Sequence, residues 1–307
     1  MAWSTSDIPD LAGRIAVVTG ANGGLGLETS RALAGAGCHV VMASRNQDKA
    51  SDAAKDILGT APGASLESVP LDLGSLESIE TAAVTILATH NAVDILVNNA
   101  GLMAMPEGRT ADGFETQLGV NHLGHWALTA QLLPALLRSA SGRVVTVTST
   151  AHHFGRPIDP ANPHLEGHYD PWRAYNQSKL ANYHFALGLH NEFEEAGVVT
   201  ASLVAHPGLT NTDLQANTVR QGGARGSGEF WHSLAQRTGM SPANGALPQL
   251  RAATDPRASS GQMYAPRFIN AGAAVRRPIL RRVGMASAIN TLWEISERET
   301  GIGIDLE

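Results

Sequence analysis

Short apolar runs and helix-like segments alternate through the first two thirds of the 307-residue chain, and this alternation constrains the fold more than any other feature. Runs rich in β-branched residues are typical of buried strands, whereas apolar residues at helical spacing are typical of helices. Strands are predicted at residues 14–20, 39–44, 66–73, 93–101, 142–149 and 198–208, and helices at 24–37, 46–59, 75–90, 119–139 and 174–197. The pattern predicts an α/β fold in which helices cover both faces of a doubly wound parallel sheet. In such a sheet the ligand crevice lies at the carboxyl ends of the strands.

Two stretches interrupt the alternation. Residues 150–173 are rich in Pro, His and Gly, and residues 212–257 contain the run RQGGARGSG. Long loops in a compact domain are often lids or binding loops, so both stretches are predicted to form an irregular substrate-loop region. A candidate seventh strand at 261–266 and a C-terminal helix at 287–301 follow. Residues 1–307 are therefore predicted to form a single Rossmann-type domain.

Charge and cysteine content narrow the class of protein. The net charge of −6 argues against nucleic acid as a partner, because phosphate backbones require basic surfaces. The locally basic run 276–282 is predicted to be solvated surface, with contact to anionic lipid or a partner as the alternative. Cys38 is the single cysteine and sits in an apolar strand-like run, which predicts a buried structural thiol in a reducing compartment. The sequence has no signal-peptide pattern and no apolar run of about 18 residues, so we expect a cytoplasmic protein without a membrane span.

A glycine-rich turn, TGANGGLG, joins the first predicted strand to the first predicted helix. Its spacing differs from G-x-G-x-x-G but serves the same physical purpose, since glycines let the backbone approach a pyrophosphate and the helix N-terminus supplies N–H groups. Close packing of strand and helix is the alternative reason for such glycines. The turn predicts a dinucleotide cradle that includes Gly20, Asn22, Gly24, Leu25 and Gly26.

The end of the second predicted strand, ASRN, should read the adenosine ribose of the dinucleotide. It offers Ser44 and Arg45 and no acidic residue. A carboxylate there would repel a 2′-phosphate, whereas a guanidinium can bind it bidentately. The cofactor is therefore predicted to be NADP(H) rather than NAD(H). NAD(H) stays open as the alternative, because Arg45 could simply be solvated and the acidic Asp48 lies nearby.

Tyr175 and Lys179 are four residues apart in a predicted helix, so their side chains share one face. A free tyrosine titrates near pH 10. An ammonium about 4 Å away, at an effective dielectric constant of about 20, would stabilise the phenolate by roughly 4 kcal/mol, or about three pKa units. This places the phenol in the range of a general acid or base. Considered alone, the pair could also be two exposed side chains on a helix surface.

These features, together with NNAG at 98–101, YNQSK at 175–179 and HPG at 206–208, resemble the short-chain dehydrogenase/reductase family. NHLGHWALT, STAHHFG, SKLAN and VAHPGLTNTDL are similar to its retinol-dehydrogenase-like branch, and the resemblance covers nearly the whole chain. It implies an NADP-dependent oxidoreductase acting on CH–OH groups, which interconverts an alcohol and a carbonyl on a hydrophobic small molecule. The family likeness also suggests a homodimer or homotetramer.

The resemblance implies site residues motif by motif. The family's catalytic set falls on Asn121, Ser149, Tyr175 and Lys179. It also implies Asp72 near the adenine ring, Asn98 and nearby backbone beside the cofactor, and Thr212 on the nicotinamide carboxamide. With the glycine turn and strand end above, the other implied cofactor contacts are Leu73, Asn99, Ala100, Gly101, Tyr175, Lys179, Pro207 and Gly208.

The sequence also bears on a non-catalytic function and on a metal site. The alternative function is a dinucleotide-binding regulator or scaffold without catalysis, which the complete tyrosine–lysine–serine set disfavours. No metal site is predicted: His164 and His168 are four residues apart, but proline-rich surroundings disfavour a helix and no H-E-x-x-H pattern occurs. These two histidines, with His152 and His153, are predicted to line or support the substrate loop.

Overall fold

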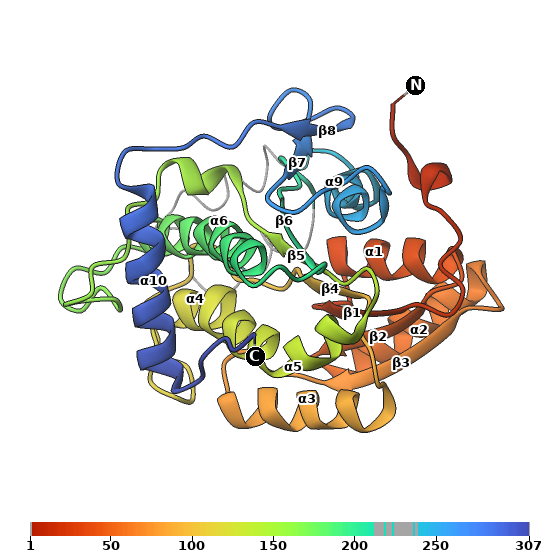
Figure 1. The fold of residues 1–307 in the computed structure, drawn as a ribbon, viewed down its shortest axis with the longest axis horizontal. Coiled ribbons are helices and arrows are strands. Elements are labelled where there is room, and N and C mark those ends of the chain that lie inside the picture. Colours follow the sequence, from red (N-terminus) through yellow and green to blue (C-terminus); the bar gives the residue numbers. More distant parts are fainter. Residues whose placement is uncertain (1, 212–217, 219–222, 224–235, 237–238, 307) are drawn as a thin grey trace.

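The computed structural model describes residues 2–306 except 212–217, 219–222, 224–235 and 237–238. An eight-stranded sheet runs through it (Figure 1). Its strands are β1 (Ile15–Thr19), β2 (His39–Ser44), β3 (Ser65–Pro70), β4 (Ile95–Asn98), β5 (Arg143–Val147), β6 (Ala201–Ala205), β7 (Met263–Pro266) and β8 (Ala274–Arg277). The order is β3-β2-β1-β4-β5-β6-β7-β8, and every pair except β7 with β8 is parallel. The predicted doubly wound sheet is confirmed.

The helices begin where the local sequence can satisfy their exposed N–H groups. Asn46 and Ser75 cap two of them by accepting from Lys49 N and Ser78 N. The described helices are α1 (Gly24–Gly35), α2 (Gln47–Thr60), α3 (Leu76–Thr89), α4 (Thr116–Leu118), α5 (Gly124–Arg138), α6 (Pro171–Glu195), α9 (Pro242–Thr254) and α10 (Met285–Thr300), with a π-helical turn, η2 (Gly119–Leu123), and short 3-10 turns, η1 (Thr5–Asp7) and η3 (Thr150–His153). None of these helices combines the length and hydrophobicity needed to cross a bilayer.

Each buried strand sends alternate residues to opposite sides, and this divides the core into layers. Val17 packs in the cluster with α3, α5 and α6, whereas its neighbours Ala16 and Val18 pack in the cluster with α1, α2 and α9. Burial on both faces explains why the sequences of these strands are continuous apolar runs. Because β1, β4 and β5 run parallel, their carboxyl ends lie at the same edge of the sheet, between the two helical layers.

Helix α9 corrects the prediction that residues 212–257 form one irregular loop. Ser241 accepts a hydrogen bond from Asn244 N, and Pro242 occupies the first turn, which are ordinary start signals for a helix. Ala246 and Leu250 are buried in the same cluster as α1. The helix was missed because Gly and Pro inside its pattern argued against it, but packing against α1 overrides that local preference.

The basic run 276–282 is partly structured, which the sequence did not predict. Its first two residues end strand β8, which pairs antiparallel with β7 through Tyr264 and Arg276. Strand β8 lies at the edge of the sheet in the described chain, and charged residues are typical of edge strands, where they discourage pairing with other chains.

The lone thiol is a core group, as predicted. Cys38 is fully buried, and burial raises its pKa to about 12. A thiol with so high a pKa carries almost no thiolate at neutral pH and is unreactive.

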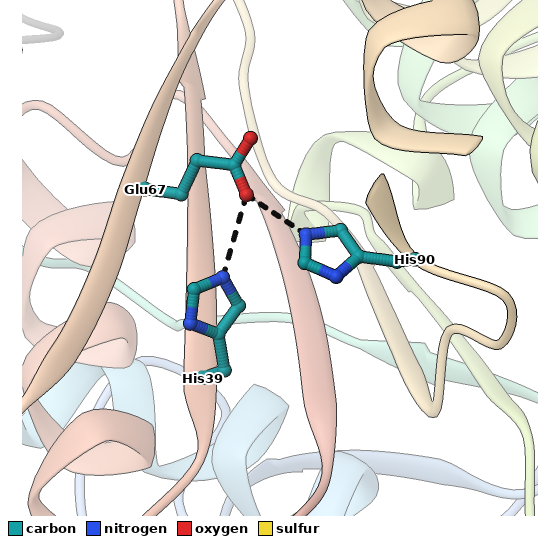
Figure 2. Close-up of side chains that lie close together, drawn as sticks. All are labelled: His39, Glu67 and His90. Atoms are coloured by element: carbon teal, nitrogen blue, oxygen red, sulfur yellow. Dashed lines mark hydrogen bonds and ion pairs between the residues drawn. The ribbon is translucent and has the colours of Figure 1, made fainter. Parts of the chain in front are cut away.

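Three side chains meet at the amino-terminal edge of the sheet, at the other end of β2 from the predicted ribose-binding residues. His39 opens β2, Glu67 lies in β3, and His90 follows α3 (Figure 2). One oxygen of the Glu67 carboxylate faces both imidazole rings.

Candidate active site

The glycine turn has the backbone geometry that the sequence predicted for a phosphate cradle. Gly20 and Gly24 have positive φ angles of 66° and 52°. A Cβ atom on Gly26 would lie 2.2 Å from the Gly20 carbonyl oxygen, so only glycine lets α1 pack this closely on the end of β1. Asn22 and Leu25 are half-buried on the same turn. The N–H groups that open α1 fit an anionic group such as a pyrophosphate.

Hydrogen bonds fasten this turn to the end of β4. Thr19 Oγ1 accepts from Asn99 N at 2.9 Å and Ala100 N at 3.0 Å, while the Asn99 side-chain amide donates to Thr19 O at 2.8 Å. Gln249 on α9 donates to Asn99 Oδ1 at 3.1 Å. The sequence pointed to neither Thr19 nor Gln249; the latter was hidden because its helix was read as a loop. By contrast, Asn98 is fully buried and donates to Thr129 Oγ1, so its side chain joins β4 to α5.

The end of β2 presents polar groups suited to a ribose or its phosphate. The Ser44 hydroxyl is buried, and among the described residues it has no hydrogen-bond partner. The Arg45 side chain is 73% exposed, and its Nη1 lies 3.9 Å from Asp72 Oδ2. An exposed ion pair of this length is weak, so the guanidinium can turn to a ligand at little cost. Asp72 Oδ1 accepts from Gly74 N, and Leu73 is buried beside it. Arg45 is thus an exposed cation at the strand end where the sequence predicted contacts with the ribose.

Tyr175, Lys179 and Ser149 converge at the carboxyl end of β5. Asp170 caps α6 by accepting from two backbone N–H groups, and this sets the rotation of the helix that carries both Tyr175 and Lys179. The Ser149 side chain lies near the Tyr175 hydroxyl and lowers its pKa. Lys179 Nζ lies 5.9 Å from the centroid of the Tyr175 ring and donates to Val147 O at 3.4 Å. Both α6 residues are only 5% exposed, so neither is the helix-surface side chain of the alternative interpretation.

The protonation energies of the pair differ from the prediction. Burial raises the pKa of Tyr175, and the nearby Ser149 side chain only partly opposes this rise. Burial also lowers the pKa of Lys179 to about 8. The expected net lowering of the Tyr175 pKa therefore does not occur in the protein without cofactor, where burial has the larger effect. Burial disfavours both charged forms, the phenolate and the ammonium, so loss of solvent is the largest cause of both shifts.

Asn121 lies in the π-helical turn η2 rather than at a simple helix start. Its side chain is fully buried, accepting from Leu102 N at 2.7 Å and donating to Ser178 Oγ at 2.9 Å. A Cβ atom on Gly101 would lie 3.0 Å from Asn121 Oδ1 and 3.3 Å from Lys179 Nζ, so the predicted asparagine and lysine meet against this glycine. Such π turns are frequent at functional sites.

His125 joins the Asn121 turn to the cradle, and the sequence did not single it out. Its Nδ1 lies 3.0 Å from the Asn121 carbonyl oxygen, and its Nε2 lies 2.9 Å from Thr19 Oγ1. A carbonyl only accepts, so Nδ1 carries the proton and Nε2 accepts from the Thr19 hydroxyl. Burial lowers the pKa of His125 to about 4, which keeps it in this neutral form. A polar residue on an otherwise apolar helix, four positions after Asn121, is the signal that could have identified it.

We expect His125→Leu to lower the free energy of unfolding by about 1–3 kcal/mol, because it leaves the buried Asn121 carbonyl and Thr19 hydroxyl with fewer partners. Chemical denaturation of purified protein measures this. His125→Gln, which keeps a donor and an acceptor, should recover part of the loss. Equal midpoints for wild type and His125→Leu would contradict this role.

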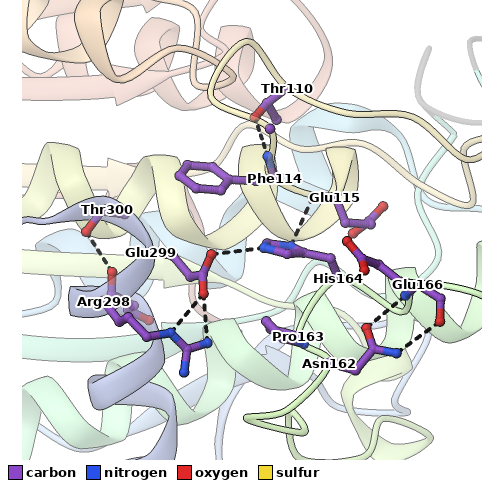
Figure 3. A network of polar contacts seen from close by, with 12 residues as sticks. Thr110, Phe114, Glu115, Asn162, Pro163, His164, Glu166, Arg298, Glu299 and Thr300 are labelled. Atoms are coloured by element: carbon purple, nitrogen blue, oxygen red, sulfur yellow. Dashed lines mark hydrogen bonds and ion pairs between the residues drawn. The ribbon is translucent and has the colours of Figure 1, made fainter.

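The predicted irregular segment 150–173 begins with the 3-10 turn η3 and ends in the first turn of α6, and Figure 3 shows contacts that hold its middle part around His164. His164 Nδ1 accepts from Glu115 N at 3.2 Å, and its Nε2 donates to Glu299 on α10 at 3.0 Å. The ring also stacks on Phe114. The prediction that these histidines support the loop is confirmed for His164. Of the others, His152 is buried against the Tyr183 ring, and His168 is exposed.

The remaining predicted cofactor residues follow β6. Gly208 N donates to His206 Nδ1 at 2.9 Å, and Pro207 precedes it in the same half-buried turn. Thr212 lies outside the described residues. The structure thus brings the other predicted residues together along one edge of the sheet.

Comparison with known proteins shows the family to which the chain belongs. The family model for short chain dehydrogenases matches residues 14–222. The short-chain dehydrogenase/reductase prx1 of Penicillium roqueforti is 39% identical over 254 residues, which span 80% of this chain and 71% of that protein. Human retinol dehydrogenase 11 is 43% identical over 211 residues, spanning 69% and 64% of the two chains. Mouse polyprenol dehydrogenase is 41% identical over 211 residues, spanning 67% and 63%.

Solved structures are similar over most of the chain. A protein of Mycobacterium paratuberculosis, described as uncharacterized, has a TM-score of 0.82 at 36% identity and covers 100% of both chains. A protein of Beutenbergia cavernae, described as an NAD(P) dependent gluconate 5-dehydrogenase with bound NADP, has a TM-score of 0.64 at 28% identity, over 83% of this chain and 96% of that one.

Proposed function

Because the chain belongs to the short-chain dehydrogenase/reductase family of oxidoreductases, we propose that it is an NADP(H)-dependent enzyme that interconverts an alcohol and a carbonyl. The observation that carries the proposal is the buried Tyr175 side chain, close to Ser149 and Lys179, at the edge of the sheet that holds the glycine turn. A hydrophobic substrate is supported by relatives named retinol dehydrogenase and polyprenol dehydrogenase.

The proposed chemistry divides between the cofactor and the protein. The bound nicotinamide supplies or accepts the hydride. In the reducing direction Tyr175 donates its proton to the developing alkoxide, and Ser149 holds that oxygen by a hydrogen bond. The Lys179 ammonium stabilises the phenolate that remains, and Asn121 positions Lys179 from the adjacent π turn.

The dinucleotide would be held by the groups described above. The glycine turn and the start of α1 would take the pyrophosphate, and Ser44 and Arg45 would take the phosphorylated ribose. Asn99, Ala100 and Gly101 would line the path toward the nicotinamide, with Pro207 and Gly208 on the other side.

The cofactor preference can be tested at Arg45. We expect Arg45→Asp to lower the ratio of kcat/KM for NADPH to kcat/KM for NADH by on the order of 10–100-fold or more, because a charge-assisted hydrogen bond worth about 1.5–3 kcal/mol is replaced by repulsion. Steady-state kinetics with both cofactors measures the ratio. Lys55→Asp makes the same charge change at an exposed position on α2 and should leave the ratio unaltered. An unchanged ratio in Arg45→Asp would mean that Arg45 does not read the 2′-phosphate.

The activity itself is tested with a panel of carbonyls and alcohols, followed by NADPH absorbance and run in parallel with NADH. Consumption of NADPH with apolar aldehydes or ketones is the expected result. Tight cofactor binding without turnover of any panel member would favour the alternative, a non-catalytic dinucleotide-binding regulator. We also infer that the protein is a homodimer or homotetramer, which light scattering tests. We infer a cytoplasmic location as well, and the buried, unpaired Cys38 supports it because such thiols fit a reducing compartment.

A further inference from the structure

The cluster of His39, Glu67 and His90 brings three potential metal ligands together from separate parts of the chain (Figure 2). His39 pairs with Ser65 and Val41 pairs with Glu67 across β2 and β3. Paired residues, and residues two apart in a strand, share a face, so His39 and Glu67 point to the same side of the sheet. Helix α3 packs on that side, and His90 is its C-cap residue.

The spacing of the donor atoms suits a small transition-metal ion. Glu67 Oε2 lies 3.4 Å from His39 Nε2 and 2.8 Å from His90 Nε2, and all the candidate ligand atoms lie within 4.8 Å of one another. A tetrahedral zinc ion with bonds of about 2.0–2.2 Å needs ligand atoms about 3.3–3.5 Å apart. Small side-chain rotations would therefore convert the cluster into a three-ligand site.

Two features around the cluster favour a cation. His39 Nδ1 lies 2.7 Å from Ser65 Oγ, and such an outer hydrogen bond fixes the ring so that Nε2 is free to ligate. The carbonyl end of α3 lies at His90, where the helix dipole favours positive charge. His90 is buried while His39 and Glu67 are half-buried, so an ion can enter and water can complete its coordination.

We propose that His39, Glu67 and His90 bind a divalent transition-metal ion such as Zn²⁺, with water as the fourth ligand. The ion would tie β2, β3 and the end of α3 together. Five residue steps along β2, about 16 Å, separate His39 from Ser44, so the site is distinct from the predicted dinucleotide crevice. The proposal does not depend on the oxidoreductase activity. The sequence did not reveal it because the ligands lie 28 and 23 residues apart and form no local motif.

The test is calorimetric titration of Zn²⁺ into the chelator-treated full-length protein, with thermal unfolding at each ratio. We expect one equivalent to bind and to raise the melting temperature. Glu67→Gln keeps the side-chain shape but removes the charged ligand, and should weaken binding by at least about 10–100-fold, since even losses in the outer shell cost that much. His39→Gln, at a half-exposed ligand, repeats the test if the Glu67 variant does not fold.

His168→Gln is the matched control, because it removes an exposed histidine outside the cluster and should bind Zn²⁺ as the wild type does. The proposal is overturned if the wild type takes up no stoichiometric ion, or if the Glu67 and His39 variants bind as tightly as His168→Gln. In either case the cluster is only a carboxylate accepting hydrogen bonds from two imidazoles.

Discussion

Replacement of Tyr175 by phenylalanine is expected to reduce turnover by on the order of 10²–10⁴-fold, the usual contribution of a positioned general acid or base. The substitution removes one hydroxyl and keeps the ring, which packs edge-on against Trp172. The binding of NADPH should change little, because the phenol's proposed role is in proton transfer. Steady-state kinetics and a fluorescence titration of NADPH separate the two effects.

Tyr264→Phe is the matched control for this experiment. Tyr264 is also buried, but it lies on β7 and its hydroxyl donates to Gln262. Loss of that hydroxyl should leave turnover close to wild type. If Tyr175→Phe kept wild-type turnover, Tyr175 would be removed from the mechanism.

Lys179→Met is expected to inactivate the protein and at the same time to stabilise it. Turnover should fall by on the order of 10²–10³-fold, because the group that stabilises the phenolate is lost. In the cofactor-free protein, however, the buried ammonium is a burden, since burial lowers its pKa from 10.5 to about 8. At about 1.4 kcal/mol for each pKa unit, this corresponds to roughly 3 kcal/mol of instability that the unbranched, uncharged methionine removes.

The pH dependence identifies the cause of this stabilisation. Below pH 8 the lysine is protonated in both folded and unfolded chains, so the full destabilisation is present. As the pH rises from about 8 to 10.5, the folded protein loses this proton first and the wild type gains stability relative to the variant. Denaturation of both proteins at pH 7 and pH 10 should show the variant's advantage shrinking. A variant less stable than the wild type at pH 7 would show that the ammonium stabilises the fold.

The strand and helix pattern was readable because it depends on residues close in sequence. The apolar runs around Val17 and Val41 predicted buried parallel strands, and the glycines at 20, 24 and 26 predicted a tight turn against α1. The four-residue spacing of Tyr175 and Lys179 placed both side chains on one helical face. Helix α9 was the exception, because its Gly and Pro weaken the local signal while contact with α1 restores the helix.

Periodicity and spacing by themselves predicted the sheet and the tight glycine turn, and the family resemblance added the proposed roles of Tyr175 and Lys179. Tertiary structure alone decided that His125 would bridge Asn121 and Thr19, that His39, Glu67 and His90 would meet, and that Tyr175 would have a raised pKa. The physical reason is that helical and strand periods are local properties of the chain. Hydrogen bonds between distant segments, and the energy of removing a charge from water, depend on which side chains the completed fold brings together and buries.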